Sequence, residues 1–127
     1  MRLTGAQARK LLGEKAPSKY HSKKCQWKGM TFDSIHERDR FIILESEMQK
    51  GKITDLNRQV RFQLLPAQTG ENGKVIERPL TYVADFVYRR DGELVVEDAK
   101  SKATRTHEYI IKRKLMLWFH GIRIQEV

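Results

Sequence analysis

The chain has 127 residues, of which 39% are hydrophobic, so it can form one domain with a modest core and is too short for two. Its single cysteine, Cys25, excludes an internal disulfide and a cysteine-based zinc site, and no apolar run is long enough to cross a membrane. Because the first residues also lack the apolar centre of a secretory signal, an intracellular, cytoplasmic protein is expected.

The net charge of +9 is unevenly distributed along the chain. Residues 1–28 carry eight Lys and Arg against one Glu, residues 29–99 carry ten against thirteen acids, and residues 100–127 carry seven against two. The basic segments at both ends fit binding of a polyanion such as nucleic acid, and the acidic middle segment fits binding of a cation such as a metal ion. A basic protein with solvated surface charges explains the same pattern.

Residues 1–30 are expected to form a basic N-terminal arm, and residues 31–127 a core domain. Within the arm, Thr4 and Gly13 fit the start and the end of a short helix, and a basic loop follows it. Part of this arm is expected to be mobile, because chain ends are often poorly tied down.

The first strongly predicted helix lies in FDSIHERDRFIILESEMQKGKI, residues 32–53, with Asp33 or Ser34 as its N-cap and Gly51 at its end. An apolar stripe should face a sheet: Phe41, Leu44 and Met48. Glu37 extends this stripe by one turn, and a carboxylate on a buried face needs a reason, such as support of a metal ion. Ser34 and Glu37 also fit a capping box, which is an equally good explanation.

The middle of the chain is expected to supply three strands. RQVRFQLLP, residues 58–66, alternates apolar and polar residues as a half-buried strand does, and residues 67–77 are expected to be a loop. LTYVADFVYRRDGELVVEDAK, residues 80–100, contains two strand-like runs around Asp91-Gly92. Asp-Gly between such runs is a strong hairpin signal, because the turn requires positive φ at both central residues.

The last part of the chain predicts a helix and a short strand. THEYIIKRKLMLWFHG, residues 106–121, has Thr106 as N-cap and Gly121 at its end, and residues 122–127 fit a strand. The face expected to be buried carries Ile111, Leu115 and Trp118. The order of helix, three strands, helix and strand predicts an α/β fold, with a mixed central sheet of about four strands flanked by helices.

The Asp91-Gly92 hairpin makes a geometric prediction about charged residues. A two-residue loop there places Asp85 directly opposite Asp98, and like charges on neighbouring strands are destabilising unless a cation lies between them. Mg²⁺, with Mn²⁺ as a substitute, suits such an oxygen-rich site. Lys100 would share the face of Asp98 and could orient a water or stabilise charge on a phosphate, whereas Glu97 would face the other way. A one-residue slip or a bulge would exchange Glu97 and Asp98.

Each of these residues also has an ordinary explanation. Asp85 could be an edge-strand charge, and Asp98 with Lys100 an ion pair at a strand end. Gln59 could contact phosphate or belong to the solvated face of its strand. The coincidence of the acids and the lysine on one face favours a site over isolated surface charges.

Taken together, Glu37 in a first helix, Asp85 in a strand and Asp98-Ala99-Lys100 in the next strand, followed by a basic helix, resemble the PD-(D/E)XK nuclease superfamily over about residues 30–127. The chain is similar in particular to a small phage-encoded endonuclease family long catalogued as a domain of unknown function, and archaeal-type Holliday junction resolvases share the same core. The resemblance departs at Ala84, where the motif has proline, and at Asp98, where Glu is more usual; Glu97 therefore stays an alternative.

The resemblance implies a restriction-endonuclease-like core with Asp85 and Asp98 as metal-binding acids, Lys100 as the catalytic lysine and Glu37 as a helical acid that supports the metal. It further implies a Mg²⁺-dependent DNA endonuclease for branched DNA such as a Holliday junction, acting in the host cytoplasm if phage-encoded. A nuclease for linear duplex or single-stranded DNA, and a non-catalytic nucleic-acid-binding protein with a nuclease fold, are the alternatives.

The expected nucleic-acid contacts are basic side chains of the arm and of the last helix region, together with one glutamine. They are Lys19, Lys23, Lys24, Lys28, Gln59, Lys102, Arg105, Lys112, Arg113 and Lys114. By analogy with small nucleases that cut two strands, a homodimer is expected, with the exposed aromatic end of the last helix as its contact.

Overall fold

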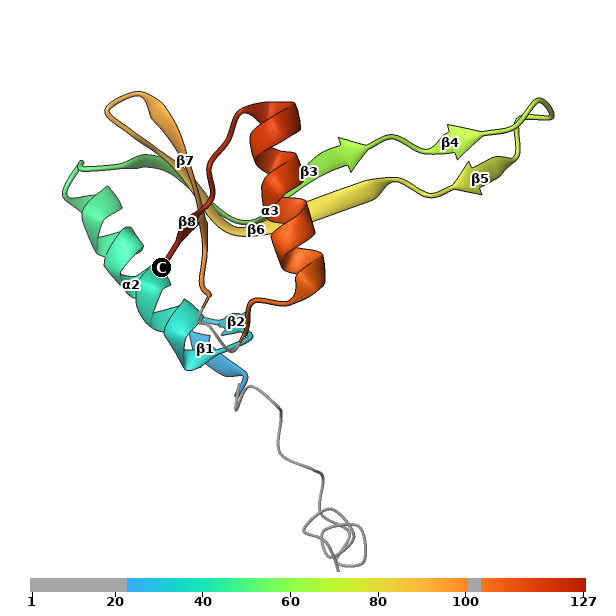
Figure 1. Cartoon of the computed structure of the whole chain (residues 1–127). Helices are drawn as coiled ribbons and strands as arrows, with labels where there is room; N and C mark the ends of the chain where they lie inside the picture. The colour runs from blue at the N-terminus through green and yellow to red at the C-terminus, as the bar shows by residue number, and fades with distance from the viewer. Residues whose placement is uncertain (1–22, 101–103) are drawn as a thin grey trace, which may run out of the picture.

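The computed structural model describes residues 23–100 and 104–127, and Figure 1 shows a mixed sheet with two helices packed on it and a long β-ribbon that projects from the body. In chain order the elements are β1 (Cys25–Trp27), β2 (Met30–Phe32), α2 (Ile35–Gln49), β3 (Thr54–Leu65), β4 (Gln68–Thr69), β5 (Val75–Glu77), β6 (Leu80–Arg90), β7 (Glu93–Asp98), α3 (His107–His120) and β8 (Gln125–Glu126). The helix expected to begin at Thr4 lies outside the described residues.

The central sheet has the strand order β3-β6-β7-β8. The first three strands are antiparallel, and β8 runs parallel to β7 because α3 carries the chain back across the sheet between them. This arrangement confirms the predicted α/β class and the mixed sheet of about four strands flanked by helices. None of the helices in the described part of the chain is both long enough and apolar enough to span a bilayer.

The helix ends follow the local signals of the sequence. Ser34, rather than Asp33, caps α2, and its Oγ accepts a hydrogen bond from the backbone N–H of Glu37 at 3.1 Å. Thr106 caps α3 in the same way, with its Oγ1 3.1 Å from the N–H of Tyr109. Gly121 ends α3 in the left-handed conformation, at φ 65°.

Each helix departs from its predicted stripe at some positions, although Phe41 and Leu44 of α2 are buried as predicted. On α3, Trp118 is 82% exposed and Ile111 is also exposed, while Tyr109 and Met116 are buried. The run of apolar residues in α3 allows several stripes, and the choice is made by the sheet, where Tyr82 and Ile124 pack against Tyr109 and Met116. On α2, Met48 is exposed, because the rings that pack beneath the helix are centred on Phe41.

Two short hairpins were missed. Residues 67–77, predicted as a loop, contain β4 and β5, which pair and extend the ribbon of β3 and β6 away from the body (Figure 1). Near the start of the described chain, β1 and β2 pair around Lys28 and Gly29, both with positive φ, and pack against α2. Both hairpins are short, so their alternation is too brief to be recognised in the sequence.

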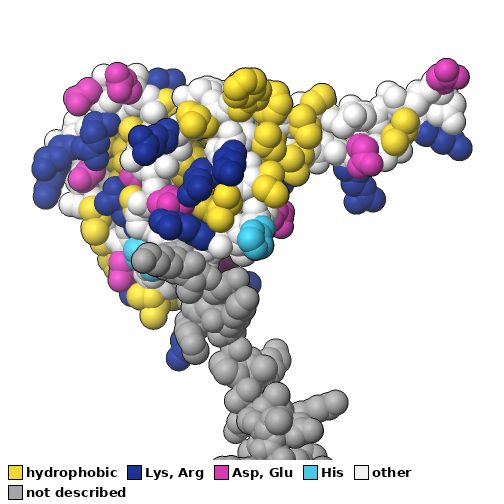
Figure 2. All heavy atoms as spheres, in the orientation of Figure 1, with side chains coloured by type: hydrophobic (Ala, Val, Ile, Leu, Met, Phe, Trp, Pro, Cys, Tyr) yellow, Lys and Arg dark blue, Asp and Glu magenta, His cyan; other side chains and the backbone are white. Residues whose placement is uncertain are grey.

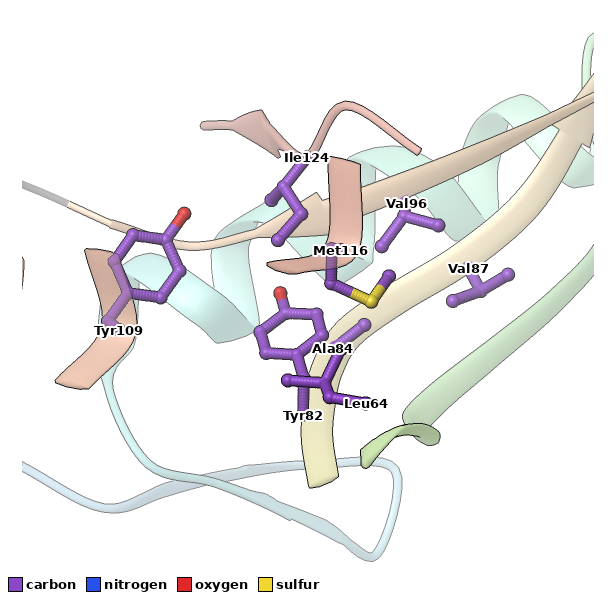
Figure 3. Close-up of a cluster of buried hydrophobic side chains, with 8 residues drawn as sticks. All are labelled: Leu64, Tyr82, Ala84, Val87, Val96, Tyr109, Met116 and Ile124. Carbon is purple, nitrogen blue, oxygen red and sulfur yellow. The ribbon is translucent and has the colours of Figure 1, made fainter. Parts of the chain in front are cut away.

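Two clusters of buried side chains lie on opposite faces of the sheet. The α3 cluster, drawn in Figure 3, comprises Leu64, Tyr82, Ala84, Val87, Val96, Tyr109, Met116 and Ile124. The α2 cluster comprises Phe32, Phe41, Leu44, Ile53, Phe86 and Tyr88. On β7 the adjacent residues Val95 and Val96 pack on the α2 cluster and in the α3 cluster respectively, as expected for successive residues of a strand.

The strands β3 and β6 exchange faces at one paired position. On β3, Arg58 lies over the ring of Phe32 in the α2 cluster, whereas Val60, two residues on, packs on the α3 cluster. Gln59 between them has φ +51°, which is unusual for a residue other than glycine. On β6, Ala84 belongs to the α3 cluster and Phe86 to the α2 cluster in the same way. Asp85 is the residue of β6 at which the strand changes faces, and it lies opposite Gln59. Asp85 therefore lies between the two faces of the sheet.

Candidate active site

The β6–β7 hairpin brings Asp85 to the end of β7. The turn has positive φ at Asp91 and Gly92, and the pairs Arg90 with Glu93 and Tyr88 with Val95 confirm the predicted register. The ladder reaches Phe86 opposite Glu97, and one step further Oδ2 of Asp85 accepts a hydrogen bond of 2.8 Å from the N–H of Ala99. Asp85 is therefore held against the segment that carries Asp98 and Lys100.

Asp98 is buried, and its two carboxylate oxygens have different surroundings. Oδ2 accepts a hydrogen bond of 2.5 Å from the hydroxyl of Tyr82. Burial and the adjacent carboxylate raise the pKa of Tyr82, so its hydroxyl stays protonated and donates. Oδ1 is buried without a hydrogen-bond partner, although Nζ of Lys100 lies 3.3 Å away as an ion pair. Oδ1, which has the Lys100 ion pair but no hydrogen bond, is thus the oxygen of this carboxylate that could bind an ion.

Lys100 is held beside Asp98 by α3. Its Nζ lies 4.8 Å from the ring centroid of Tyr109, which attracts the ammonium through the negative face of the ring. Asp98 and Lys100 line a cavity of about 280 Å³ together with Lys112 and Tyr109 of α3. Asp98 and Lys100 therefore line the same cavity.

Glu37 joins the group through Gln59. Its carboxylate is buried, and Oε1 accepts a hydrogen bond of 3.2 Å from Nε2 of Gln59, which also donates to Oδ1 of Asp85 at 3.2 Å. One half of the predicted capping box is formed: Ser34 Oγ accepts from the N–H of Glu37. The Glu37 carboxylate bonds to Gln59 and not back to the N–H of Ser34. The carboxylate of Glu37 thus contributes to the acidic group while its backbone contributes to the helix cap.

Repulsion among these carboxylates changes their proton affinities. Burial, followed by the negative charges of Asp98 and Glu37, raises the pKa of Asp85 from 3.8 to about 7. Burial and the charge of Asp33 likewise raise the pKa of Glu37. The site therefore holds more negative charge than its own residues neutralise, and a cation would relieve it.

Glu97, the alternative acid, is occupied elsewhere. Arg40 of α2 donates two hydrogen bonds to its carboxylate, at 2.8 and 2.6 Å, and the hydroxyl of Tyr88 donates a third. These partners lie with the α2 cluster, on the face opposite Asp98. Glu97 is buried as a paired structural acid, and Asp98 is the residue of the pair that meets Asp85 and Lys100.

The donor set fits a small, hard cation held by few protein ligands. Across residues 23–100 and 104–127, no three His, Cys, Asp or Glu side chains converge closely enough to hold an ion among themselves. Mg²⁺ commonly uses only one or two carboxylates and takes its other ligands from water and phosphate. Asp85 and Asp98, with the unpartnered Oδ1 of Asp98, match that pattern, and Glu37 supports them through Gln59.

The basic residues expected to contact nucleic acid are spread over several places. Lys19 and Lys102 lie outside the described residues. Lys23 and Lys24 are exposed, and Lys28 pairs with Glu45 at 2.9 Å, away from the acidic group. Arg105, Lys112, Arg113 and Lys114 surround the first half of α3, where Figure 2 shows many Lys and Arg side chains on the same face of the molecule. Only Lys112 lines the cavity of Asp98 and Lys100.

Two tyrosines that position the site, Tyr82 and Tyr109, are not among the residues predicted from the sequence. In a regularly alternating strand, Tyr82 would lie on the face of β6 opposite to Asp85 and away from Asp98. Because β6 changes faces at Asp85, the Tyr82 side chain instead reaches Asp98. Tyr109 was missed because the predicted stripe of α3 faced elsewhere. A tyrosine in the first turn of a helix, three residues after the cap, offered no recognisable signal.

Comparison with known proteins identifies a family but no activity. The chain belongs to the family described as protein of unknown function, DUF1064, whose family model matches residues 17–125. No curated protein matches the chain significantly, and no solved structure does.

Proposed function

We propose that this protein is a Mg²⁺-dependent DNA endonuclease of the PD-(D/E)XK superfamily, with a restriction-endonuclease-like core, and that branched DNA such as a Holliday junction is its preferred substrate. One observation carries the proposal: Asp85 and Asp98 meet at the end of β7 with the ammonium of Lys100 3.3 Å from an otherwise unpartnered carboxylate oxygen. The preference for branched DNA rests on the family resemblance of the sequence.

The chain's own groups fix the reacting geometry. Tyr82 and the N–H of Ala99 orient the carboxylates of Asp98 and Asp85, so that both can hold the ion while Glu37 and Gln59 support Asp85 from the other side. Lewis-acid stabilisation of the charge on the phosphate is the chemistry that Mg²⁺ supplies when bound there. The N–H groups of Lys100 hold the attacking water or donate to a phosphate oxygen. The water oxygen bonds to phosphorus, the bond to the leaving oxygen breaks, and the proton that the water loses is balanced by protonation of the leaving oxygen.

The basic surface around the site gives the proposal its substrate class. Lys112 lines the same cavity as Asp98 and Lys100, while Arg113 and Lys114 lie on another flank of α3. Such side chains bind backbone phosphates without reading the base sequence, so binding should weaken steeply with salt. We also propose a homodimer through Trp118 and Phe119, which are exposed at the end of α3, since two sites would cut two strands.

The experiment compares labelled four-way junctions, Y-forks, linear duplex and single strands, each with Mg²⁺ or with chelator. Asp98→Asn and Lys100→Ala should reduce cleavage by at least about 100-fold while DNA binding persists. The matched controls are Asp39→Asn and Lys50→Ala, which make the same changes at exposed positions of α2 and its C-cap and should cut like the wild type.

Each outcome decides one part of the proposal. Cleavage that survives Asp98→Asn and Lys100→Ala, or persists in chelator, would refute the mechanism. Binding without any Mg²⁺-dependent cleavage would identify a non-catalytic nucleic-acid-binding protein. Equal cutting of linear duplex or single strands would remove the preference for branched DNA, and equal cutting of RNA would widen the substrate class.

A further inference from the structure

We infer that a second cationic site, separate from the active-site cavity, binds the sugar–phosphate backbone of DNA away from the phosphate that is cut. This inference rests on the proposed function. The site is a groove of about 760 Å³ between α3 and β8, lined by Arg105, Arg113, Lys114 and Arg123 with Leu117 and Glu126 among its other walls, and is called the basic groove below.

The charges of the basic groove are only partly neutralised within the protein. Glu126 is its one acid, and it accepts from Arg105 at 2.8 Å, Arg113 at 3.2 Å and the hydroxyl of Tyr109 at 2.7 Å. Burial opposes its ionisation, but the Tyr109 hydroxyl and the two arginines outweigh burial and lower the pKa of Glu126. A fully compensated carboxylate does not repel an approaching anion as a free one would.

Two cations of the basic groove remain available. Within residues 23–100 and 104–127, the side chains of Lys114 and Arg123 have no hydrogen-bond or ion-pair partner, and both residues are exposed. Neighbouring cations without counter-charges are unfavourable on a folded surface unless a ligand carries the opposite charge. Arg123 lies just before β8 and Lys114 on α3, so only the tertiary structure brings them into one groove.

The helix α3 separates the basic groove from the active site. Glu108, Tyr109 and Lys112 line the active-site cavity, whereas Arg113, Lys114 and Leu117 line the groove. At 100° per residue these two sets occupy different flanks of the helix. A single phosphate cannot occupy both places, so a chain bound in the groove while another phosphate meets Lys100 must reach across α3 or belong to a second segment.

Size and lining favour a DNA backbone over a small anion. The groove is much larger than one phosphate, and its apolar wall at Leu117 and Ile124 suits deoxyribose between charged phosphates. The groove is also coupled to the active site through Tyr109, whose ring has Lys100 at 4.8 Å and Arg113 at 6.0 Å. A backbone bound to Arg113 would therefore act close to the group that holds the catalytic lysine.

The test measures the salt dependence of DNA binding in chelator, where cleavage does not interfere. The full chain carrying both Lys114→Gln and Arg123→Gln is compared with wild type by fluorescence anisotropy of a labelled four-way junction and a labelled duplex. The matched control carries Lys50→Gln and Lys52→Gln, which remove the same total charge at exposed positions near Gly51.

For the groove variant, the slope of log K against log salt on duplex should fall by about 1.8, because two phosphate contacts are lost, and affinity at a fixed salt should fall at least about fivefold. The control should lose less than about twofold. A groove variant that behaves like the control would overturn the inference even if the wild type cuts DNA. Conversely, if the groove variant shows the reduced slope but the wild type never cuts DNA, the groove is confirmed as a DNA-binding site and the proposed function is refuted.

Discussion

Replacing Asp85 by asparagine should make the protein more stable at alkaline pH, at the expense of the proposed activity. In the folded protein the pKa of Asp85 is raised from 3.8 to about 7 by burial and by the charges of Asp98 and Glu37. Well below pH 3.8 the carboxyl group is protonated in both states, so it costs nothing. As the pH rises from about 4 to about 7, the unfolded chain ionises the group while the folded state keeps it protonated, so stability falls across this window and the full cost is present above pH 7.

The difference between 3.8 and about 7 corresponds to roughly 4 kcal/mol, which is an upper bound because Asp98 and Glu37 share the repulsion. Asparagine keeps an oxygen for the N–H of Ala99, but its own amide nitrogen then faces Nε2 of Gln59, which stays bound to Glu37, so one hydrogen bond worth about 1 kcal/mol is lost. A net gain of about 2–3 kcal/mol at pH 8 is expected, or about 6–10 °C in Tm.

Thermal and urea unfolding of wild type and Asp85→Asn at pH 5, 6.5 and 8 would measure this gain. It should be smallest at pH 5 and largest at pH 8, and the exposed Asp39→Asn should show no such trend. Millimolar Mg²⁺ should raise the stability of the wild type at pH 8 and leave that of Asp85→Asn nearly unchanged, because only the wild type has both carboxylates. A variant no more stable than the wild type at pH 8 would show that the Asp85 carboxylate is not strained, and would refute the reasoning.

Three further substitutions have definite expected effects. Arg40→Ala leaves the buried Glu97 without its bidentate partner and should cost about 3–5 kcal/mol in urea unfolding, which Glu97→Gln in the same chain should partly restore. Gln59→Gly should keep or raise the free energy of unfolding, because glycine adopts the positive φ of this position without strain. It should lower cleavage, because the hydrogen bonds that link Glu37 to Asp85 are lost. A variant that loses both stability and cleavage would contradict the backbone strain at Gln59. Gly92→Ala, at φ +80° in the β6–β7 turn, should cost about 1–2 kcal/mol without changing the pH dependence of stability, as monitored by circular dichroism.

Features set by neighbouring residues could be predicted from the sequence. The caps Ser34 and Thr106, the glycine end of α3 and the Asp91-Gly92 turn each depend on groups a few residues apart, and the structure has all of them. The register followed from that turn, because a two-residue loop leaves one possible pairing on each side of it. The position of Glu97 opposite Phe86, and hence its separation from Asp98, followed in turn.

Features that depend on packing between distant segments were decided only in the tertiary structure. The exchange of faces at Gln59 and Asp85 brings Tyr82 to Asp98, and no local pattern announces it, because regular alternation predicts the opposite face. Likewise the apolar run of α3 is compatible with several buried faces, and contact with Tyr82 and Ile124 selects Tyr109 and Met116. Periodicity reports which faces a segment can bury, but the free energy of burial is realised only against the surface that the rest of the chain provides.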